Sequence, residues 1–213
     1  MIIIYILPMK TASLLRLLLA TCFLAPAGAQ ASTIQMVSNG GFETSSVASG
    51  TWAITSSLAG WTAGALGVEV RNHVAGDAYA GQRYVELDTT GNSWISQTLA
   101  TSAGSTYALS FAYAPREGVA AASNGIEVFW NGASKGIFTG NGGAGNAWNV
   151  YKMNLVGLGG AGELKFAAVG ASDSLGGALD AISVTAVPEP ATLATMGFGL
   201  GLIGLFRRRR SRQ

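Results

Sequence analysis

Residues Thr106–Ala114, TYALSFAYA, alternate bulky and small side chains without interruption. Such strict alternation predicts a β-strand with one buried face, because successive side chains of a strand point to opposite sides of its sheet. The bulky set occupies one face, and small residues occupy the other. The bulky residues are Tyr107, Leu109, Phe111 and Tyr113.

A hairpin is predicted a short way along the chain. Gly125–Trp130 is a candidate strand with Ile126, Val128 and Trp130 on one face, and Asn131-Gly132 follows it directly. Asn-Gly between two strand-like runs favours a two-residue hairpin turn, so Ser134–Phe138 is the expected return strand. Further candidate strands are Ile34–Val37, Val68–Arg71, Arg83–Asp88, Trp94–Leu99, Trp148–Leu155, Glu163–Ala168 and Leu179–Thr185.

About ten short strands with no long helical period predict an all-β fold of two packed antiparallel sheets. We expect this β-sandwich domain to occupy residues 32–186. The Gly-rich stretches 140–145 and 157–162 are expected to be loops rather than phosphate-binding turns, since no helical pattern follows either of them.

Residues 1–31 have the organisation of a secretory signal peptide. Lys10 and Arg16 precede an apolar run, and the segment ends in Ala29-Gln30-Ala31, a small-residue cleavage pattern. The alternative is an uncleaved membrane anchor. The single cysteine, Cys22, lies inside this segment, so a domain cleaved after Ala31 has no disulfide and depends on burial for stability.

The last segment, residues 187–213, combines three features in a fixed order. Val187-Pro188-Glu189-Pro190 is followed by the uncharged stretch 191–206 and then by Arg207, Arg208, Arg209 and Arg210. A 16-residue helix is roughly 24 Å long. It therefore spans the roughly 30 Å core of a bilayer only marginally, with the arginines on the cytoplasmic side. The segment is expected to be a transmembrane helix inserted transiently in the inner membrane.

This order resembles the PEP-CTERM sorting signal of Gram-negative bacteria that produce extracellular polysaccharide. The resemblance implies recognition by an exosortase, processing near the Pro-Glu-Pro motif, and a final location at the cell surface or in the extracellular matrix. An ordinary tail anchor is the alternative.

The domain itself is mildly acidic. Between residues 32 and 187 there are six basic and ten acidic side chains, a net charge of −4, so the basic residues of the whole chain are concentrated in its ends. A domain with this charge and no basic stripe is not expected to bind nucleic acid.

The domain resembles galactose-binding-like jelly-roll carbohydrate-binding modules, and a related cell-wall family of plants and PEP-CTERM bacteria. The blocks that carry the resemblance occur in the family's order. They are Asn39-Gly40-Gly41-Phe42-Glu43, Gly60-Trp61, Val68-Glu69-Val70, Gly81–Asp88, Ile95–Leu99, Tyr107–Phe111 and Leu179–Val184.

The resemblance also implies a structural calcium ion between the first and last strands. Glu43 and Asp180 stand at the positions of its carboxylate ligands, and calcium prefers such hard oxygens. The alternative is that Glu43 caps a turn and Asp180 accepts backbone hydrogen bonds.

Carbohydrate ligands require an exposed aromatic plate beside planar hydrogen-bonding groups. Trp94 and Trp148 each follow loop-like residues and are candidate plates, although tryptophans of a sandwich also serve as core residues. Three arginines at predicted strand ends are candidates for binding hydroxyl or carboxylate pairs at one rim, namely Arg71, Arg83 and Arg116. The alternative is separate ion pairs, such as Arg116 with Glu117 or Glu86.

Catalysis has little support in the sequence. His73 is the only histidine, and no nucleophile motif accompanies it. Glu86 and Asp88 are alternate residues of one predicted strand, so their Cβ atoms would be about 6.6–6.8 Å apart, within the range of an inverting glycosidase. Any strand with two such carboxylates has that spacing. We therefore predict a non-catalytic module that binds exopolysaccharide or cell-wall glycan. A structural biofilm or floc matrix protein without a sugar ligand is the alternative, and a glycoside hydrolase is less favoured.

Overall fold

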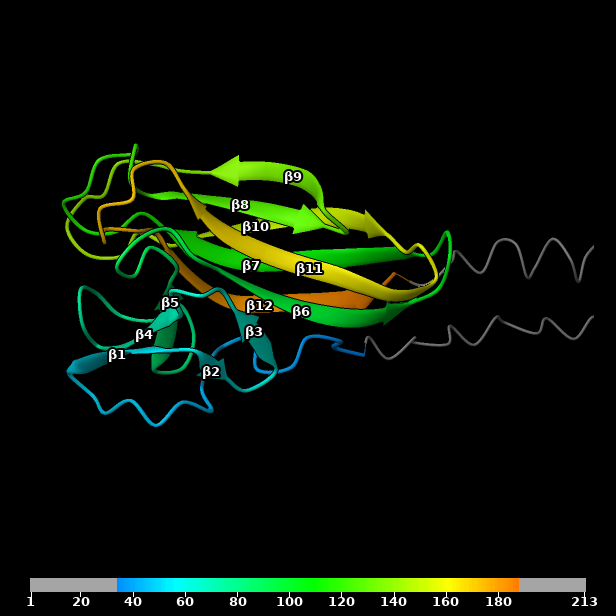
Figure 1. Ribbon diagram of the computed structural model, residues 1–213, viewed down its shortest axis with the longest axis horizontal. Helices are drawn as coiled ribbons and strands as arrows, with labels where there is room; N and C mark the ends of the chain where they lie inside the picture. Colours follow the sequence, from blue (N-terminus) through cyan, green and yellow to red (C-terminus); the bar gives the residue numbers. More distant parts are fainter. Residues whose placement is uncertain (1–33, 188–213) are drawn as a thin grey trace, which may run out of the picture. The chain divides into compact units, whose positions relative to one another are not determined.

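The computed structural model describes residues 34–187 and contains only β-strands as regular structure in that range. Twelve strands form two antiparallel sheets of six strands each (Figure 1). The strands are β1 (Thr51–Thr55), β2 (Ser57–Leu58), β3 (Trp61–Ala63), β4 (Val68–Asn72), β5 (Arg83–Glu86), β6 (Trp94–Thr101), β7 (Thr106–Ala114), β8 (Gly125–Trp130), β9 (Ala133–Phe138), β10 (Asn149–Val156), β11 (Gly160–Val169) and β12 (Ala178–Ala186).

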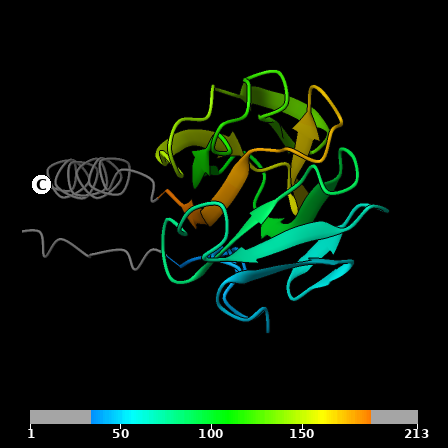
Figure 2. The same ribbon diagram turned by 90° about the vertical axis from the view of Figure 1, so that its left-hand side faces the viewer.

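The chain alternates between the sheets as it proceeds. The first sheet has the order β1-β4-β5-β12-β7-β10, and the second has the order β2-β3-β6-β11-β8-β9. The last strand, orange in Figures 1 and 2, therefore lies inside the first sheet between β5 and β7. This is the predicted all-β jelly-roll sandwich.

The core lies between the two sheets and has the predicted period of two. In β7, Leu109 and Phe111 are fully buried in the main core, whereas Ser110 lies on the outer face. Phe111 contacts Phe166 of the opposite sheet edge-on, with 5.3 Å between the ring centroids. Burial of large side chains from both sheets is the dominant source of stability in a domain of this kind.

The predicted hairpin is confirmed. β8 and β9 pair in antiparallel register with Trp130 opposite Ala133. Asn131 and Gly132 both have positive φ angles, 51° and 76°, as a two-residue hairpin turn of the mirror-image type requires.

The predicted strand at residues 34–37 is reduced to a single bridge, between Gln35 and Thr185. The Gln35 side chain replaces part of the ladder, because its Oε1 accepts the N–H groups of Val37 and Val184 at 3.1 and 2.9 Å. Strands β1–β3 were not predicted. They are at most five residues long, which is too short for alternation to stand out in the sequence.

Several predictions fall outside the described residues. These are the signal peptide at 1–31, the apolar segment 191–206 and the arginines 207–210. Within residues 34–187, no helix is long and apolar enough to cross a membrane.

Candidate functional site

One end of the first sheet carries charged and aromatic side chains on its outer face. Val68 and Val70 of β4 point into the core, so Glu69 and Arg71 point outward. Cross-strand register aligns Trp52 of β1 with Arg71, and it aligns Glu69 with Glu86 of β5. The pairing of three strands thus assembles a site from residues far apart in the sequence.

Glu86 is the centre of an ion-pair network on this face. Its Oε2 lies 2.8 Å from Arg71 Nη2, and its Oε1 lies 2.9 Å from Arg116 Nη1. Arg71 also pairs with Glu69 through its Nε. Both glutamates and Arg71 are buried, whereas Arg116 keeps about a fifth of its side chain exposed.

A loop after β11 covers this network. The Gly176 N–H donates to Glu86 Oε1 at 2.7 Å, and Arg116 Nη1 donates to the Ser174 carbonyl at 2.9 Å. The same loop is anchored by Asp88, whose Oδ2 accepts the N–H groups of Asp173 and Ser174 at 3.0 Å each. Burial under the loop raises the pKa of Glu86 to about 7, against the lowering effects of both arginines and of the Gly176 amide.

Arg116 is positioned by the residues that follow it. Asn124 is fully buried, and its Oδ1 accepts the Arg116 N–H at 2.9 Å while its Nδ2 donates to the carbonyls of Val119 and Gly140. Arg116 bonds to Glu86 and Ser174 through Nη1, so its Nη2 and Nε have no partner among the described residues. Those two groups are available to a ligand.

A pocket of about 350 Å³ opens above the network. Trp52 forms part of its wall and is 53% exposed, because β1 is the edge strand of the sheet. The polar residues that line it include Glu69, Arg71, Thr89, Thr90, Arg116 and Ser174. An exposed indole beside guanidinium and hydroxyl groups can stack on an apolar face and hydrogen-bond to the edges of the same ligand.

The structure distributes the five candidate ligand residues as follows. Arg71 and Arg116 meet at Glu86. Arg83 instead pairs with Glu43 at 3.2 Å, on the other face of β5. Trp94 lies in the second sheet beneath the Lys165 ammonium, 4.7 Å from its ring centroid. Trp148 donates to the Asp77 carbonyl and packs edge-on against Tyr84, with 5.7 Å between the ring centroids, and it does not line the pocket.

Trp52 is the residue that sequence reasoning missed. Its signal is the alternation of Trp52 and Ile54 in a five-residue run, which puts both on one face of a strand. Its exposure depends on β1 being an edge strand, and no local pattern reveals that.

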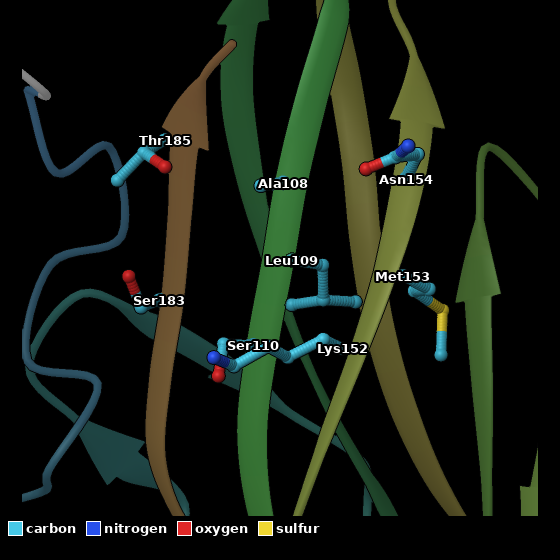
Figure 3. A pocket seen from close by; sticks show the side chains of 8 residues that line it. All are labelled: Ala108, Leu109, Ser110, Lys152, Met153, Asn154, Ser183 and Thr185. Carbon is cyan, nitrogen blue, oxygen red and sulfur yellow. The ribbon is translucent and has the colours of Figure 1, made fainter.

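A second hollow of about 560 Å³ lies on the same outer face, over β12, β7 and β10 (Figure 3). Its polar side chains are Ser110, Ser183, Thr185, Asn154 and the Lys152 ammonium. It contains no aromatic residue, so it offers no plate for stacking.

Glu43 and Asp180 hold the same loop from two sides. Glu43 Oε1 accepts the N–H groups of Gln82 and Arg83 at 2.8 Å, and Asp180 Oδ2 accepts the Ala80 N–H at 3.0 Å. Burial raises the pKa of Asp180 to about 6, and the nearby Glu43 carboxylate adds to this shift. The opening motif and the closing strand also join directly, since the Ile182 N–H donates to the Gly40 carbonyl.

The contacts of both carboxylates are those of the alternative expectation, because both accept backbone N–H groups, and their hard oxygens are also of the type that calcium binds. Each carboxylate oxygen can accept more than one bond, and a cation would relieve the repulsion between the two groups. Within residues 34–187 no group of three or more His, Cys, Asp or Glu side chains could hold a metal, so further ligands would have to be amide, hydroxyl or backbone oxygens. Arg83 already neutralises part of the Glu43 charge.

Comparison with known proteins first defines the class of fold. FisC, a Stig cyclase of Fischerella sp. TAU crystallised with an indole compound, is similar with a TM-score of 0.53 and 16% identity, over 75% of this chain and all of that one. A family 35 carbohydrate-binding module of Clostridium thermocellum has a TM-score of 0.44 at 20% identity, over 72% of this chain and 98% of the module. TmCBM61, solved with β-1,4-galactotriose, has a TM-score of 0.48 at 17% identity, over 72% of this chain and 99% of that one. The domain is a β-sandwich of two six-stranded antiparallel sheets, and FisC shares this fold.

The C-terminal segment identifies a sorting signal. Residues 186–210 match the family described as the PEP-CTERM protein-sorting motif, so the chain carries that motif, which indicates export and sorting to the cell surface.

Two toxins share sequence with the chain. It is 34% identical over 152 residues to the multifunctional-autoprocessing repeats-in-toxin of Vibrio cholerae serotype O1, and 37% identical over 101 residues to that of Vibrio vulnificus. These matches cover 70% and 47% of this chain but only 3% and 2% of the toxins, so the chain spans a small part of these relatives.

Proposed function

We propose that the domain is a non-catalytic carbohydrate-binding module that engages exopolysaccharide or cell-wall glycan outside the cell. The observation that carries the proposal is the pocket in which half-exposed Trp52 stands beside Arg71 and Arg116. The sorting motif supports it, because export brings the domain to the compartment where such glycans lie.

The chemistry of the pocket suits a sugar ring. The Trp52 indole can cover the apolar C–H face of a pyranose, and the free N–H groups of Arg116 can donate to hydroxyl pairs on its edge. Two glutamates offset much of the charge of the two arginines. This balance favours hydroxyl groups as ligands over a dense array of anionic groups.

The carboxylates of the network do not suit hydrolysis. Glu86 is 1% exposed and bound by two arginines, and Asp88 is fully buried and bound by backbone N–H groups. A glycosidase needs its acid and its base on either side of a bound sugar, within reach of the scissile bond. These contacts support binding without turnover as the role of the pocket.

Calcium belongs to this proposal as a structural ion at Glu43 and Asp180. Its chemistry there would be to neutralise two converging carboxylates and to fasten the opening motif to the last strand. The loop at residues 80–83, which both carboxylates hold, would gain most from it.

The tail is the segment that an exosortase, the proposed sorting partner, would recognise. Exosortase processing near Pro188-Glu189-Pro190 would release the domain from transient attachment to the inner membrane. The domain would then act at the cell surface or within the extracellular matrix.

Affinity electrophoresis of the full chain in mild detergent, through gels containing the producing organism's own exopolysaccharide, tests this function. Retardation that free oligosaccharides of that polymer abolish is the expected result. If no host glycan retards the protein, yet deletion of its gene alters the biofilm or floc, the domain is a structural matrix protein instead.

A further inference from the structure

The described chain enters and leaves the sandwich at one end. Gln35 forms a bridge with Thr185, and the Val187 N–H donates to the Thr106 carbonyl at 2.9 Å. We call this the exit end, and it comprises residues 34–35, 102–106, 156–161 and 185–187.

The exit end lies opposite the candidate pocket along β12. This strand begins at Ala178, which pairs with Glu86 of the pocket network, and runs to Ala186. Its eight steps correspond to roughly 27 Å at the rise of an antiparallel strand. The pocket and the exit end therefore lie at opposite ends of the first sheet.

Large apolar side chains are exposed at the exit end. Val187 is 42% exposed, Val156 is 54% exposed and Leu158 is 68% exposed. Val156 pairs with Thr106, the residue whose carbonyl binds Val187, so these positions come together. Ile34, 73% exposed, precedes the Gln35 bridge at the same end.

Charged residues are missing from the two connecting segments at this end, the second of which was expected to be a loop through residue 162 but enters β11 at Gly160. Residues 102–105 (SAGS) and 157–161 (GLGGA) consist of small or apolar residues only. The loops also touch, since a Cβ built on Gly159 would lie 3.3 Å from Ala103 Cβ. Placing such a surface against lipid costs less free energy than placing a charged surface there, because no charged group has to lose its hydration.

The tether to the tail is very short. Only residues 188–190 separate Val187 from the uncharged stretch 191–206. Three extended residues span at most about 11 Å. If 191–206 enters the bilayer, as its sequence predicts, the tether keeps Val187 within about 11 Å of the membrane surface, and contact of the exit end with the lipid then depends on its own side chains.

We propose that the exit end is a membrane-contacting surface, which rests on the lipid headgroups while the tail is inserted and holds the candidate pocket at the far end of β12 from the membrane. Val156, Leu158 and Val187 would lie at the acyl boundary, as the apolar face of an interfacial segment does. The proposal does not depend on the pocket binding a sugar.

Fluorescence quenching in vesicles tests this orientation. The full chain with Cys22→Ser is inserted in vesicles of phosphatidylethanolamine and phosphatidylglycerol. An environment-sensitive NBD probe is attached to a single cysteine, either Leu158→Cys at the exit end or Leu66→Cys in the loop beside Thr89, near the pocket. Leu66 is a matched control, since it is also a leucine exposed in a loop, at 44%.

Spin-labelled lipid bearing its nitroxide near the headgroup is expected to remove most of the emission from position 158 and little from position 66. A second probe at Ala103→Cys should lose its quenching when Leu158→Glu is added and keep it with Leu158→Met, while circular dichroism shows both variants folded. The proposal is overturned if 158 is quenched no more than 66 in chains that float with the vesicles. It is also overturned if the emission at 158 shifts only as the protein-to-lipid ratio rises, because a second copy of the chain would then cover this surface.

Discussion

Replacing Trp52 with alanine should weaken glycan binding without unfolding the domain. A buried tryptophan covers roughly 150–250 Å², so its 53% exposed fraction leaves roughly 80–130 Å² available to a ligand. At about 25 cal/mol per Å², with a sugar covering half to all of that area, the loss is roughly 1–3 kcal/mol. This corresponds to a dissociation constant weakened on the order of 5- to 150-fold.

Titration calorimetry of the full chain with an oligosaccharide that wild type binds would measure this loss. Ile137→Ala is the matched control, because Ile137 is 58% exposed on β9 of the other sheet and should change the affinity less than twofold. Both variants should keep the wild-type melting temperature within a few degrees. The reasoning fails if Trp52→Ala binds as tightly as Ile137→Ala, since the ligand would then lie elsewhere.

The remaining predictions concern the pH dependence, the loop at residues 80–83 and the calcium ion. Glu86 has a folded pKa of about 7, above its unfolded value, so its contribution to stability is full below about pH 4.5 and is lost as pH rises to 7. Glu86→Gln should remove the fall in melting temperature between about pH 4.5 and 7, because the variant has no carboxyl group to ionise. A Glu86→Gln variant that is less stable than wild type at pH 8 would contradict this prediction. Gly81→Ala should cost about 1–3 kcal/mol in chemical denaturation, because φ is +73° and its Cβ would overlap Glu43 Oε1. Gly104→Ala, with φ +75° and open space around it, should cost about 1 kcal/mol, and equal losses would show that the Glu43 contact does not matter. Calcium should raise the melting temperature of wild type and leave Asp180→Asn unchanged, and a chelator should reverse the rise; the same rise in both proteins would place the ion elsewhere.

The sequence was sufficient to predict the elements whose signals are local. Alternation in Thr106–Ala114 reports a strand because side-chain direction follows from backbone geometry alone. Asn131-Gly132 reports the hairpin because both residues tolerate the positive φ that the turn requires. The sorting motif is also a local pattern, so it too could be read directly.

The arrangement of the opening and closing motifs could be predicted from the sequence only in part. Their likeness to a known family correctly implied that they lie side by side, since Gly40 bonds to Ile182. No sequence pattern could show that the Gln35 side chain takes the place of backbone hydrogen bonds in the predicted strand 34–37. That replacement depends on Gln35 lying beside Val184 of β12, whose N–H donates to Gln35 Oε1.

The residues of the candidate site came together through tertiary structure alone. Arg71 and Arg116 meet because β5 presents Glu86 between them and a distant loop closes over all three. Trp52 is exposed because β1 ends its sheet, and Arg83 is excluded because it points from the opposite face of β5. The sequence alone determined the strands from β4 onward, the turn and the sorting motif, which depend on neighbours along the chain. Strand order and loop closure depend on contacts between distant residues, and they decided which side chains share a pocket.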